Sequence, residues 1–224
     1  LLLIGLDDAA AVRAMSAALG SPYDVSGAAH LPAALAAGWP GHLVGGHGGA
    51  VTALRVEGPA PSVSYRAGML LRALEGFGAR HGELDARNSA LFWRTIRDVA
   101  PFTLDPQATS SPYVWRLSVP PAEGAAVAAA LAERLPATYF YDWGGGLIWL
   151  ALPPRVPNAG AGTIRAELAR CGGHATLMRA PDDMRLAVPV FHPQPAALAA
   201  LTRRVKESFD PNRVFNPGRM APEV

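Results

Sequence analysis

Two histidines stand where an imidazole could be exposed at the end of a strand. His174 follows a Gly-Gly pair, and His192 lies between Phe191 and Pro193. Histidine is the usual proton acceptor near neutral pH, because its ordinary pKa is close to 6.5. A lone histidine is, however, more often a hydrogen-bonded structural residue than a catalytic base. Both interpretations stay open for His174 and His192.

A second group of candidate residues is aromatic. Tyr139, Tyr141 and Trp143 alternate along one segment, which predicts that they share one face of a strand, and Trp149 follows a Gly-Gly-Gly turn. Trp149 is therefore expected to face the other three across a hairpin. Packing in the core is one interpretation of this group, and the aromatic wall of a flavin or substrate cavity is the other.

The most specific pattern lies near the end of the chain, where residues 209–220 read FDPNRVFNPGRM. Asp210 is placed to cap a turn, the prolines favour an extended backbone, and Gly218 permits a close approach to another surface. Asn216 offers a donor and an acceptor, and Arg219 offers a permanent cation. These groups suit a heteroaromatic or anionic ligand. Val214 and Phe215 are apolar and are expected to be buried.

The elements that must position these residues are clearest in the second half of the chain. Apolar periodicity predicts strands, helices and a hairpin in the order β-α-β-β-α-β, which is the split βαβ or ferredoxin-like unit. The segments are 113–119, a helix around 127–131, 139–143, 147–152, a helix over 164–171, and 174–178.

The first half looks like a degraded copy of the same order. It has a strand at 1–6, a helix from Asp7 or Asp8, an extended strand around 23–29, a strand at 51–56 and a helix over 62–76, and a further helix near 88–100 follows. We therefore expect an α+β fold in which two ferredoxin-like pseudo-repeats, residues 1–110 and 111–224, form one antiparallel sheet covered by helices. A last helix at 195–209, with an apolar stripe, and the tail belong to the second half.

Composition excludes several classes of function. The chain has 224 residues, with 20 Lys and Arg against 18 Asp and Glu, and no basic run of the kind that binds nucleic acid. Glycine and proline interrupt its long uncharged stretch, so no membrane-spanning helix is expected. Cys171 is the one cysteine, which excludes an internal disulfide and fits a reducing, cytoplasmic compartment.

The tail resembles the C-terminal signature of FAD-linked oxidases of the vanillyl-alcohol oxidase type. Three further runs are similar to the smaller flavin-binding subunit of bacterial glycolate oxidase: residues 172–177 (GGHATL), 115–121 (WRLSVPP) and 141–145 (YDWGG). The resemblance covers nearly the whole chain and is most specific in its last third. It implies a C-terminal cap domain, which in this family closes over the isoalloxazine ring of FAD and follows an N-terminal FAD-binding domain.

The resemblance also implies a chemistry, in which a 2-hydroxy acid such as glycolate loses hydride to the flavin while a base takes its hydroxyl proton and an arginine pairs its carboxylate. By this similarity Asn216, Arg219 and Gly218 would contact the cofactor together with Trp143, and His192 and His174 would be catalytic. No histidine pattern for a metal site is matched. The implied partners are a catalytic flavin subunit and an iron–sulfur subunit, which could bring the protein to the inner face of the membrane.

The apolar run at 1–6 leads directly into two aspartates, so we expect a strand that is entered from something upstream, with the FAD-binding domain absent from this chain. The fragment alone is then expected to lack bound FAD. The alternative is a non-enzymatic ferredoxin-like module that binds a small ligand or assembles subunits.

Overall fold

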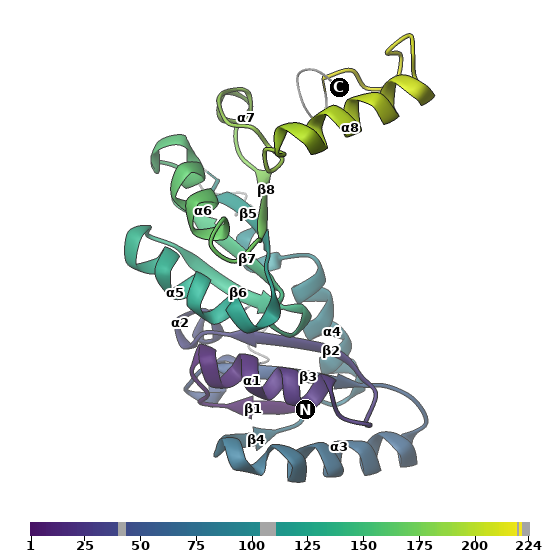
Figure 1. The fold of residues 1–224 in the computed structure, drawn as a ribbon. Helices are drawn as coiled ribbons and strands as arrows, with labels where there is room; N and C mark the ends of the chain where they lie inside the picture. The colour runs from purple at the N-terminus through teal and green to yellow at the C-terminus, as the bar shows by residue number, and fades with distance from the viewer. Residues whose placement is uncertain (40–43, 104–110, 219, 221–224) are drawn as a thin grey trace.

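A computed structural model describes residues 1–39, 44–103, 111–218 and 220 of the protein (Figure 1). Its eight strands form one sheet in the order β4-β1-β3-β2-β6-β7-β5-β8, and all the registered strand pairs are antiparallel. Because strands with consecutive numbers are mostly separated in this order, helices must cross over the sheet to connect them.

The first ferredoxin-like unit runs from β1 to β4. Its strands are ordered β4-β1-β3-β2, as a split βαβ unit requires. The short β4 completes the unit and was absent from the pattern expected from sequence. The elements are β1 (Leu2–Ile4), α1 (Asp8–Leu19), β2 (Val25–Leu31), α2 (Ala33–Ala37), β3 (Val51–Val56), α3 (Ala60–Leu74) and β4 (Arg80–Gly82), followed by α4 (Ala86–Arg97).

The second unit has the same strand order in the opposite direction across the sheet, which gives β6-β7-β5-β8. The second strand of each unit, β2 or β6, is the one that meets the other unit. The elements are β5 (Tyr113–Ser118), α5 (Gly124–Arg134), β6 (Thr138–Asp142), β7 (Leu147–Leu152), α6 (Ala161–Leu168) and β8 (His174–Arg179), followed by α7 (Asp182–Ala187) and α8 (Ala196–Phe209). The expected α+β fold with two split βαβ units is confirmed.

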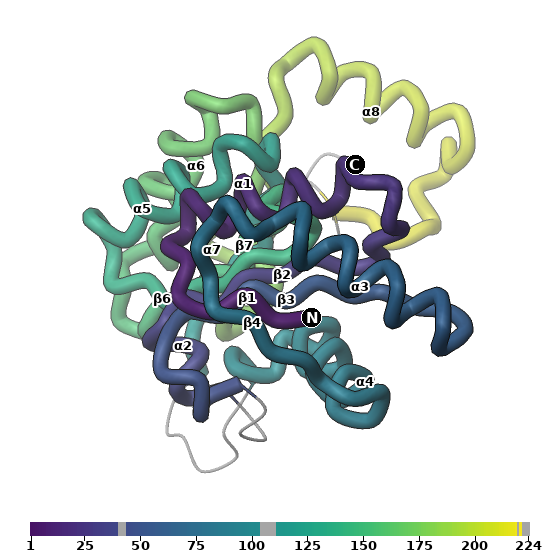
Figure 2. The backbone as a smooth tube through the Cα atoms, turned by 90° about the horizontal axis from the view of Figure 1, so that it is seen from below, coloured from purple at the N-terminus to yellow at the C-terminus, as the bar shows by residue number. Residues whose placement is uncertain are grey.

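Helices cover both faces of the sheet, as Figure 2 shows. Helices α1, α5 and α6 lie on one face, with α3 packed beside α1, and they enclose a core that runs under both units from Leu3 to Leu177. Helices α2 and α4 lie on the other face over a second core, in which the ring of Trp39 packs against those of Phe92 and Phe140. Burying Phe92 completely contributes about 2–3 kcal/mol.

The second helix layer is shorter than the sheet. It covers the first unit and the centre, where Val114 and Ala151 still belong to its core, and it leaves the far end of β5 and β8 uncovered. Along β5, Trp115 and Leu117 face the α5 and α6 side and are buried, whereas Arg116 and Ser118 point to the uncovered face and are half-buried. Considering only the residues that the structure describes, this part of the sheet surface is accessible.

Helix α8 extends away from the sheet, as Figure 1 shows. The expected apolar stripe is present on it, but it is exposed and makes no core. Leu201 is 52% exposed and Phe209 is 83% exposed, and Val214 and Phe215 in the tail are also exposed. The expectation that Val214 and Phe215 are buried is therefore wrong for this structure, since α8 projects beyond the elements that could cover them. None of the helices in the described residues is long and apolar enough to cross a membrane.

Candidate functional site

A cleft of about 670 Å³ lies where the two units meet, on the face of the sheet that carries α4. Arginines and tryptophans dominate its polar and aromatic lining, so we call it the arginine–tryptophan cleft. Strands β2 and β3 and helix α4 form the wall from the first unit, and strands β5, β6 and β7 form the wall from the second. The arginines and tryptophans in the lining are Arg55, Arg94, Arg97, Arg116, Trp93, Trp143 and Trp149.

Arg116 reaches the cleft because of its place in the sheet. It is paired with Trp149 on β7 and with Thr176 on β8, so these three side chains stand in one row on the same face. The carbon of its guanidinium lies 4.9 Å from the centre of the Trp143 ring. At this distance a guanidinium is attracted to the face of an indole by a cation–π interaction, which holds the cation without neutralising it.

Trp143 is held in an unusual backbone conformation. It directly follows β6 and has a φ of +52°, in the left-handed region that side chains rarely adopt. Its amide donates a 2.8 Å hydrogen bond to Oδ1 of Asp142, and a Cβ on Gly124 would lie 2.3 Å from the carbonyl oxygen of Gly145 in the same turn. The turn is thus fixed from both sides, yet the Trp143 side chain is 59% exposed. A strained residue with an exposed ring is typical of a functional position.

The arginines around the cleft differ in whether a carboxylate forms an ion pair with them. Arg55 forms a 2.6 Å ion pair with Glu57, and Arg97 forms a 2.7 Å ion pair with Asp98. Within the part of the chain that the structure describes, neither Arg94 nor Arg116 has a carboxylate within ion-pair distance. Burial raises the pKa of the Asp142 carboxyl, and the hydrogen bond from the Trp143 amide offsets only part of this effect. The cleft can therefore accept an anion and a flat ring together.

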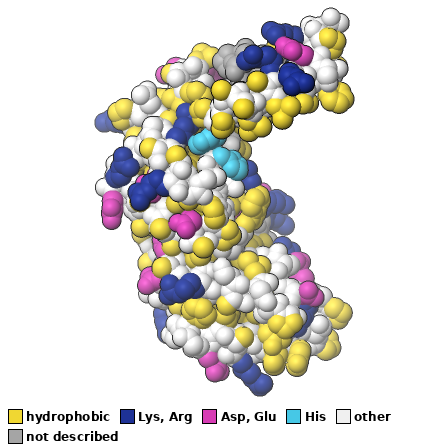
Figure 3. Space-filling model, viewed as in Figure 1, with side chains coloured by type: hydrophobic (Ala, Val, Ile, Leu, Met, Phe, Trp, Pro, Cys, Tyr) yellow, Lys and Arg dark blue, Asp and Glu magenta, His cyan; other side chains and the backbone are white. Residues whose placement is uncertain are grey.

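The two candidate histidines lie close to each other at the edge strand β8, where Figure 3 shows exposed histidine side chains below α8. His174 is exposed and is paired with Ser118, two residues from Arg116 on the same face of the sheet. His192 is half-buried, and its Nδ1 accepts a 3.3 Å hydrogen bond from the amide of Ala175. Burial, and then the charges of Arg165 and His174, lower the pKa of His192. Neither histidine lines the cleft.

The tail is anchored to α8 through Asp210, which confirms the turn expected there. The carboxylate of Asp210 accepts hydrogen bonds of 2.8 Å from the Val214 amide and 2.9 Å from the Phe215 amide. Asn216, with a φ of +47°, and Gly218 follow in exposed positions. Neither residue lines the cleft that contains Trp143, and Arg219 lies outside the described residues.

The expected aromatic face is only partly correct. Tyr139 and Tyr141 do share a face of β6, but it is the face toward α1, where both hydroxyls bond to Asp8. Trp149 is paired with Phe140 and so lies on the opposite face. Trp143 stands beyond the last residue of β6, where the alternation of the strand ends. Neither tryptophan therefore faces the two tyrosines.

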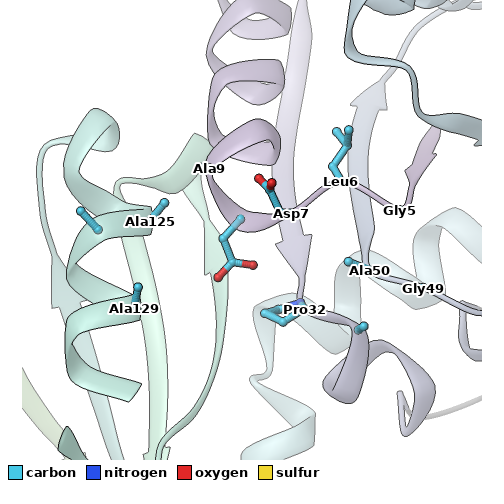
Figure 4. Close-up of a pocket in the computed structure, with 12 residues that line it drawn as sticks. Gly5, Leu6, Asp7, Ala9, Pro32, Gly49, Ala50, Ala125 and Ala129 are labelled. Carbon is cyan, nitrogen blue, oxygen red and sulfur yellow. The ribbon is translucent and has the colours of Figure 1, made fainter. Parts of the chain in front are cut away.

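A second cavity, of about 790 Å³, lies between the starts of α1 and α2 and the helix α5 (Figure 4). Small apolar residues such as Ala125 and Ala129 form most of its wall. Its two carboxylates already have partners, since Asp7 caps α1 by accepting a 2.7 Å hydrogen bond from Ala10 and Asp8 accepts from three side chains. Its chemistry is therefore less suited to binding an anion than that of the arginine–tryptophan cleft.

Arg116 and Arg94 are site residues that the sequence patterns did not single out. The sequence pattern could have identified Arg116 as a site residue, because it interrupts the apolar residues of a strand at a position where the side chain faces away from the α5 and α6 core. No sequence pattern could have identified Arg94, because an arginine on a helix is usually solvated. Within the described ranges, no group of three or more His, Cys, Asp or Glu side chains is placed to hold a metal ion.

Comparison with known proteins gives one informative similarity. No family model matches the chain. The chain is 33% identical over 134 residues to the glycolate oxidase subunit GlcE of Escherichia coli (strain K12). The matched region is 59% of this chain and 32% of that subunit, so the chain spans about a third of the relative's length. The chain is thus distantly similar to a glycolate oxidase subunit.

Proposed function

We propose that this chain is the cap, or substrate-side, domain of an FAD-dependent 2-hydroxy acid oxidase or dehydrogenase subunit, with glycolate as the substrate. The observation that carries the proposal is the pairing of Arg116 with the exposed ring of Trp143 on an accessible part of the sheet. The similarity to GlcE supports the same class of protein. In this proposal the sheet face that carries the cleft is turned toward the flavin.

The residues of the cleft fit a planar heteroaromatic ring beside a small acid. The exposed indole of Trp143 offers a flat apolar surface, and Arg116 and Arg94 offer cations with geometry that suits a carboxylate. When bound, FAD would accept the hydride from the α-carbon of the acid. We assign to this chain the remaining tasks, in which Arg116 binds the carboxylate and the tryptophans orient the acid and exclude water.

His174 is the better of the two candidate bases. Its imidazole is exposed on the face that carries Arg116, so it could take the hydroxyl proton of an acid bound there. In the neutral form of His192, Nδ1 already accepts from the Ala175 amide, so only Nε2–H remains available, and it is a donor. His192 would then act by positioning β8 and His174.

The other proposed cofactor contacts come from the tail. Asn216, Gly218 and Arg219 would reach the flavin from the side of α8, while most contacts with FAD would be made by a separate FAD-binding domain. The chain alone would therefore not retain FAD. Its partners would be the catalytic flavin subunit and the iron–sulfur subunit of a cytoplasmic assembly at the inner face of the membrane.

A non-enzymatic ligand-binding or assembly module is the second candidate. It is favoured by one observation, which is that the cleft lining has cations and indoles but no histidine among the described residues. Such a lining can bind an anion without changing it. The two candidates differ in whether the protein reduces a bound flavin.

The test uses the complete protein that contains this chain, purified without added cofactor. We expect flavin absorbance, and we expect glycolate to reduce an added dye. Arg116→Ala should raise the glycolate KM at least tenfold, because a hydrogen bond to a charged partner contributes about 1.5–3 kcal/mol. Arg134→Ala, on the exposed end of α5, is the matched control and should leave the KM unchanged.

Three results would contradict the proposal. Absence of flavin, together with anion binding that quenches tryptophan fluorescence, would favour the non-enzymatic module. Equal KM values for Arg116→Ala and Arg134→Ala would remove Arg116 from the site. An unchanged rate for His174→Gln would remove His174 as the base.

A further inference from the structure

The two ferredoxin-like units are joined by very little sheet. In the described part of the chain, β2 and β6 are paired at one position, where His30 stands opposite Tyr141. Inside the units the pairing is longer, with six registered pairs between β5 and β7. Backbone hydrogen bonds alone therefore define the angle between the units poorly.

A network of polar side chains crosses this junction on the face toward α1, and Asp8 is its centre. Oδ1 of Asp8 lies 3.1 Å from Nε2 of His30, and Oδ2 accepts hydrogen bonds of 2.7 Å from Tyr141 and 2.9 Å from Tyr139. Nδ1 of His30 lies 2.9 Å from the hydroxyl of Thr52. One carboxylate thus connects α1, β2 and β3 of the first unit to β6 of the second.

The network is buried and its hydrogen bonds are satisfied. The His30 side chain is completely buried, and that of Asp8 is 25% exposed. An ionised carboxylate only accepts hydrogen bonds, so Nε2 of a neutral His30 donates to Asp8 and Nδ1 accepts from Thr52. Burial by itself raises the pKa of the Asp8 carboxyl, but the hydrogen bonds from His30, Tyr141 and Tyr139 outweigh burial and leave the pKa below its ordinary value. The carboxylate is therefore ionised at neutral pH.

The arginine–tryptophan cleft lies on the opposite face of the same junction. Its first wall includes Gly27 on β2, and its second includes Asp142, which directly follows Tyr141 on β6. Successive side chains of a strand point to opposite faces, so a strand held at Tyr141 on one face has Asp142 fixed on the other, and Trp143 directly follows Asp142 in the turn after β6. A change in the angle between the units would change the width of the cleft.

We propose that Asp8 is a positioning residue for the arginine–tryptophan cleft. The hydrogen bonds of its carboxylate connect β2 to β6 on the α1 face, and this connection sets the separation of the two cleft walls on the other face. The proposal concerns the geometry of the cleft and does not depend on the reaction carried out there.

The test is a two-dimensional ¹H–¹⁵N spectrum of the 224-residue chain, in which each tryptophan indole gives one N–H signal. The cleft contains Trp93, Trp143 and Trp149, while Trp115 is the reference in the core of the second unit. Trp115 is suitable, because its Nε1 donates a 2.8 Å hydrogen bond to Ala159 inside the second unit. Signals are assigned by single Trp→Phe variants.

Asp8→Asn and Tyr141→Phe should each shift or broaden the signals of the three cleft tryptophans and leave that of Trp115 in place. The double variant should shift them no further than Asp8→Asn, because both changes break the same connection. Asp7→Asn is the matched control. It removes the same charge from the start of α1, keeps a side chain that caps helices equally well, and should change nothing in the cleft.

Two outcomes would overturn the proposal. One is a spectrum of Asp8→Asn in which the cleft signals are unchanged. The other is a spectrum in which the Trp115 signal moves as much as the cleft signals, which would indicate general loosening. If Asp8→Asn does not fold, Tyr141→Phe decides the matter by the same two criteria, because it removes a single hydroxyl and keeps the ring in the core.

Discussion

The guanidinium of Arg116 lies 4.9 Å from the centre of the Trp143 ring, and Trp143 holds this position with a positive φ. Arg116 lies on β5 and Trp143 directly follows β6, and the two residues are 27 positions apart in the chain. Their contact therefore depends on the register of three strands, since β5 pairs with β7 and β7 pairs with β6. The contact gives the cleft a cation and an exposed ring side by side.

Trp143→Gly should be more stable than Trp143→Ala by about 1 kcal/mol. Both variants lose the indole and its contact with Arg116, but glycine adopts a positive φ without strain and alanine does not. Urea denaturation of the two variants measures the difference. An equal or higher stability of Trp143→Ala would mean that the backbone at this position is not strained.

Gly27→Ala should lower the stability of the protein by about 1–3 kcal/mol and displace the ring of Trp93. A Cβ at Gly27 would lie 3.1 Å from a carbon of the Trp93 ring and 3.3 Å from the Cβ of Arg55. Denaturant unfolding and the indole signal of Trp93 report the two effects. Gly162→Ala is the control. No atom lies within 4 Å of its added Cβ, and its place in α6 predicts equal or higher stability.

Asp8 should make stability depend on pH in the acid range. Its pKa in the folded protein is lower than the ordinary value of 3.8, so its contribution is complete above about pH 4 and is lost as pH falls through the folded pKa. Asp8→Asn lacks this contribution at every pH. The stability difference between the wild type and this variant, from denaturant midpoints at a series of pH values, should therefore shrink below about pH 4. A difference that stays constant into stronger acid would contradict the lowered pKa.

Tyr139 should ionise late in an alkaline titration. Burial, and then the charge and hydrogen bond of Asp8, raise the pKa of Tyr139 to about 12. The ultraviolet absorbance of phenolate should therefore lose a step near pH 12 in Tyr139→Phe. In Asp8→Asn the same step should move to lower pH, because the charge is removed while the burial remains. A titration of Asp8→Asn that matches the wild type would show that Asp8 does not raise the pKa of Tyr139.

Asp210→Ala should expose the tail to trypsin. The carboxylate of Asp210 holds the amides of Val214 and Phe215, and its hydrogen bond with Lys206, followed by the bonds from those amides, lowers its pKa to about 2. Without it, cleavage after Arg213 should become several-fold faster, as followed by mass spectrometry. Asp183→Ala, at an exposed position of α7, is the control. Equal cleavage of both variants would show that the tail does not depend on Asp210.

Local sequence patterns predicted most of the elements. The strand at 51–56 and the strand at 147–152 agree with β3 and β7 in their bounds, because each is a short apolar run between turn-forming residues. The helix at 195–209 agrees with α8 to within a residue, because its limits are set by Pro195 and by the Asp-Pro pair. Segments such as β4 and α2, with three and five residues, are too short to show a period, and they were missed.

The candidate site was likewise predictable from the sequence only in part. The sequence by itself determined the α+β class, the order of the elements and the identity of conspicuous residues such as Trp143 and His174, since these depend on periodicity and residue type. The tertiary structure decided which of them meet. Strand register placed Trp149 beside Arg116 and away from Tyr139, and the pairing of β2 with β6 at the junction brought Tyr141 to Asp8. These contacts join residues far apart in the chain, and a pattern of neighbouring residues carries no information about them.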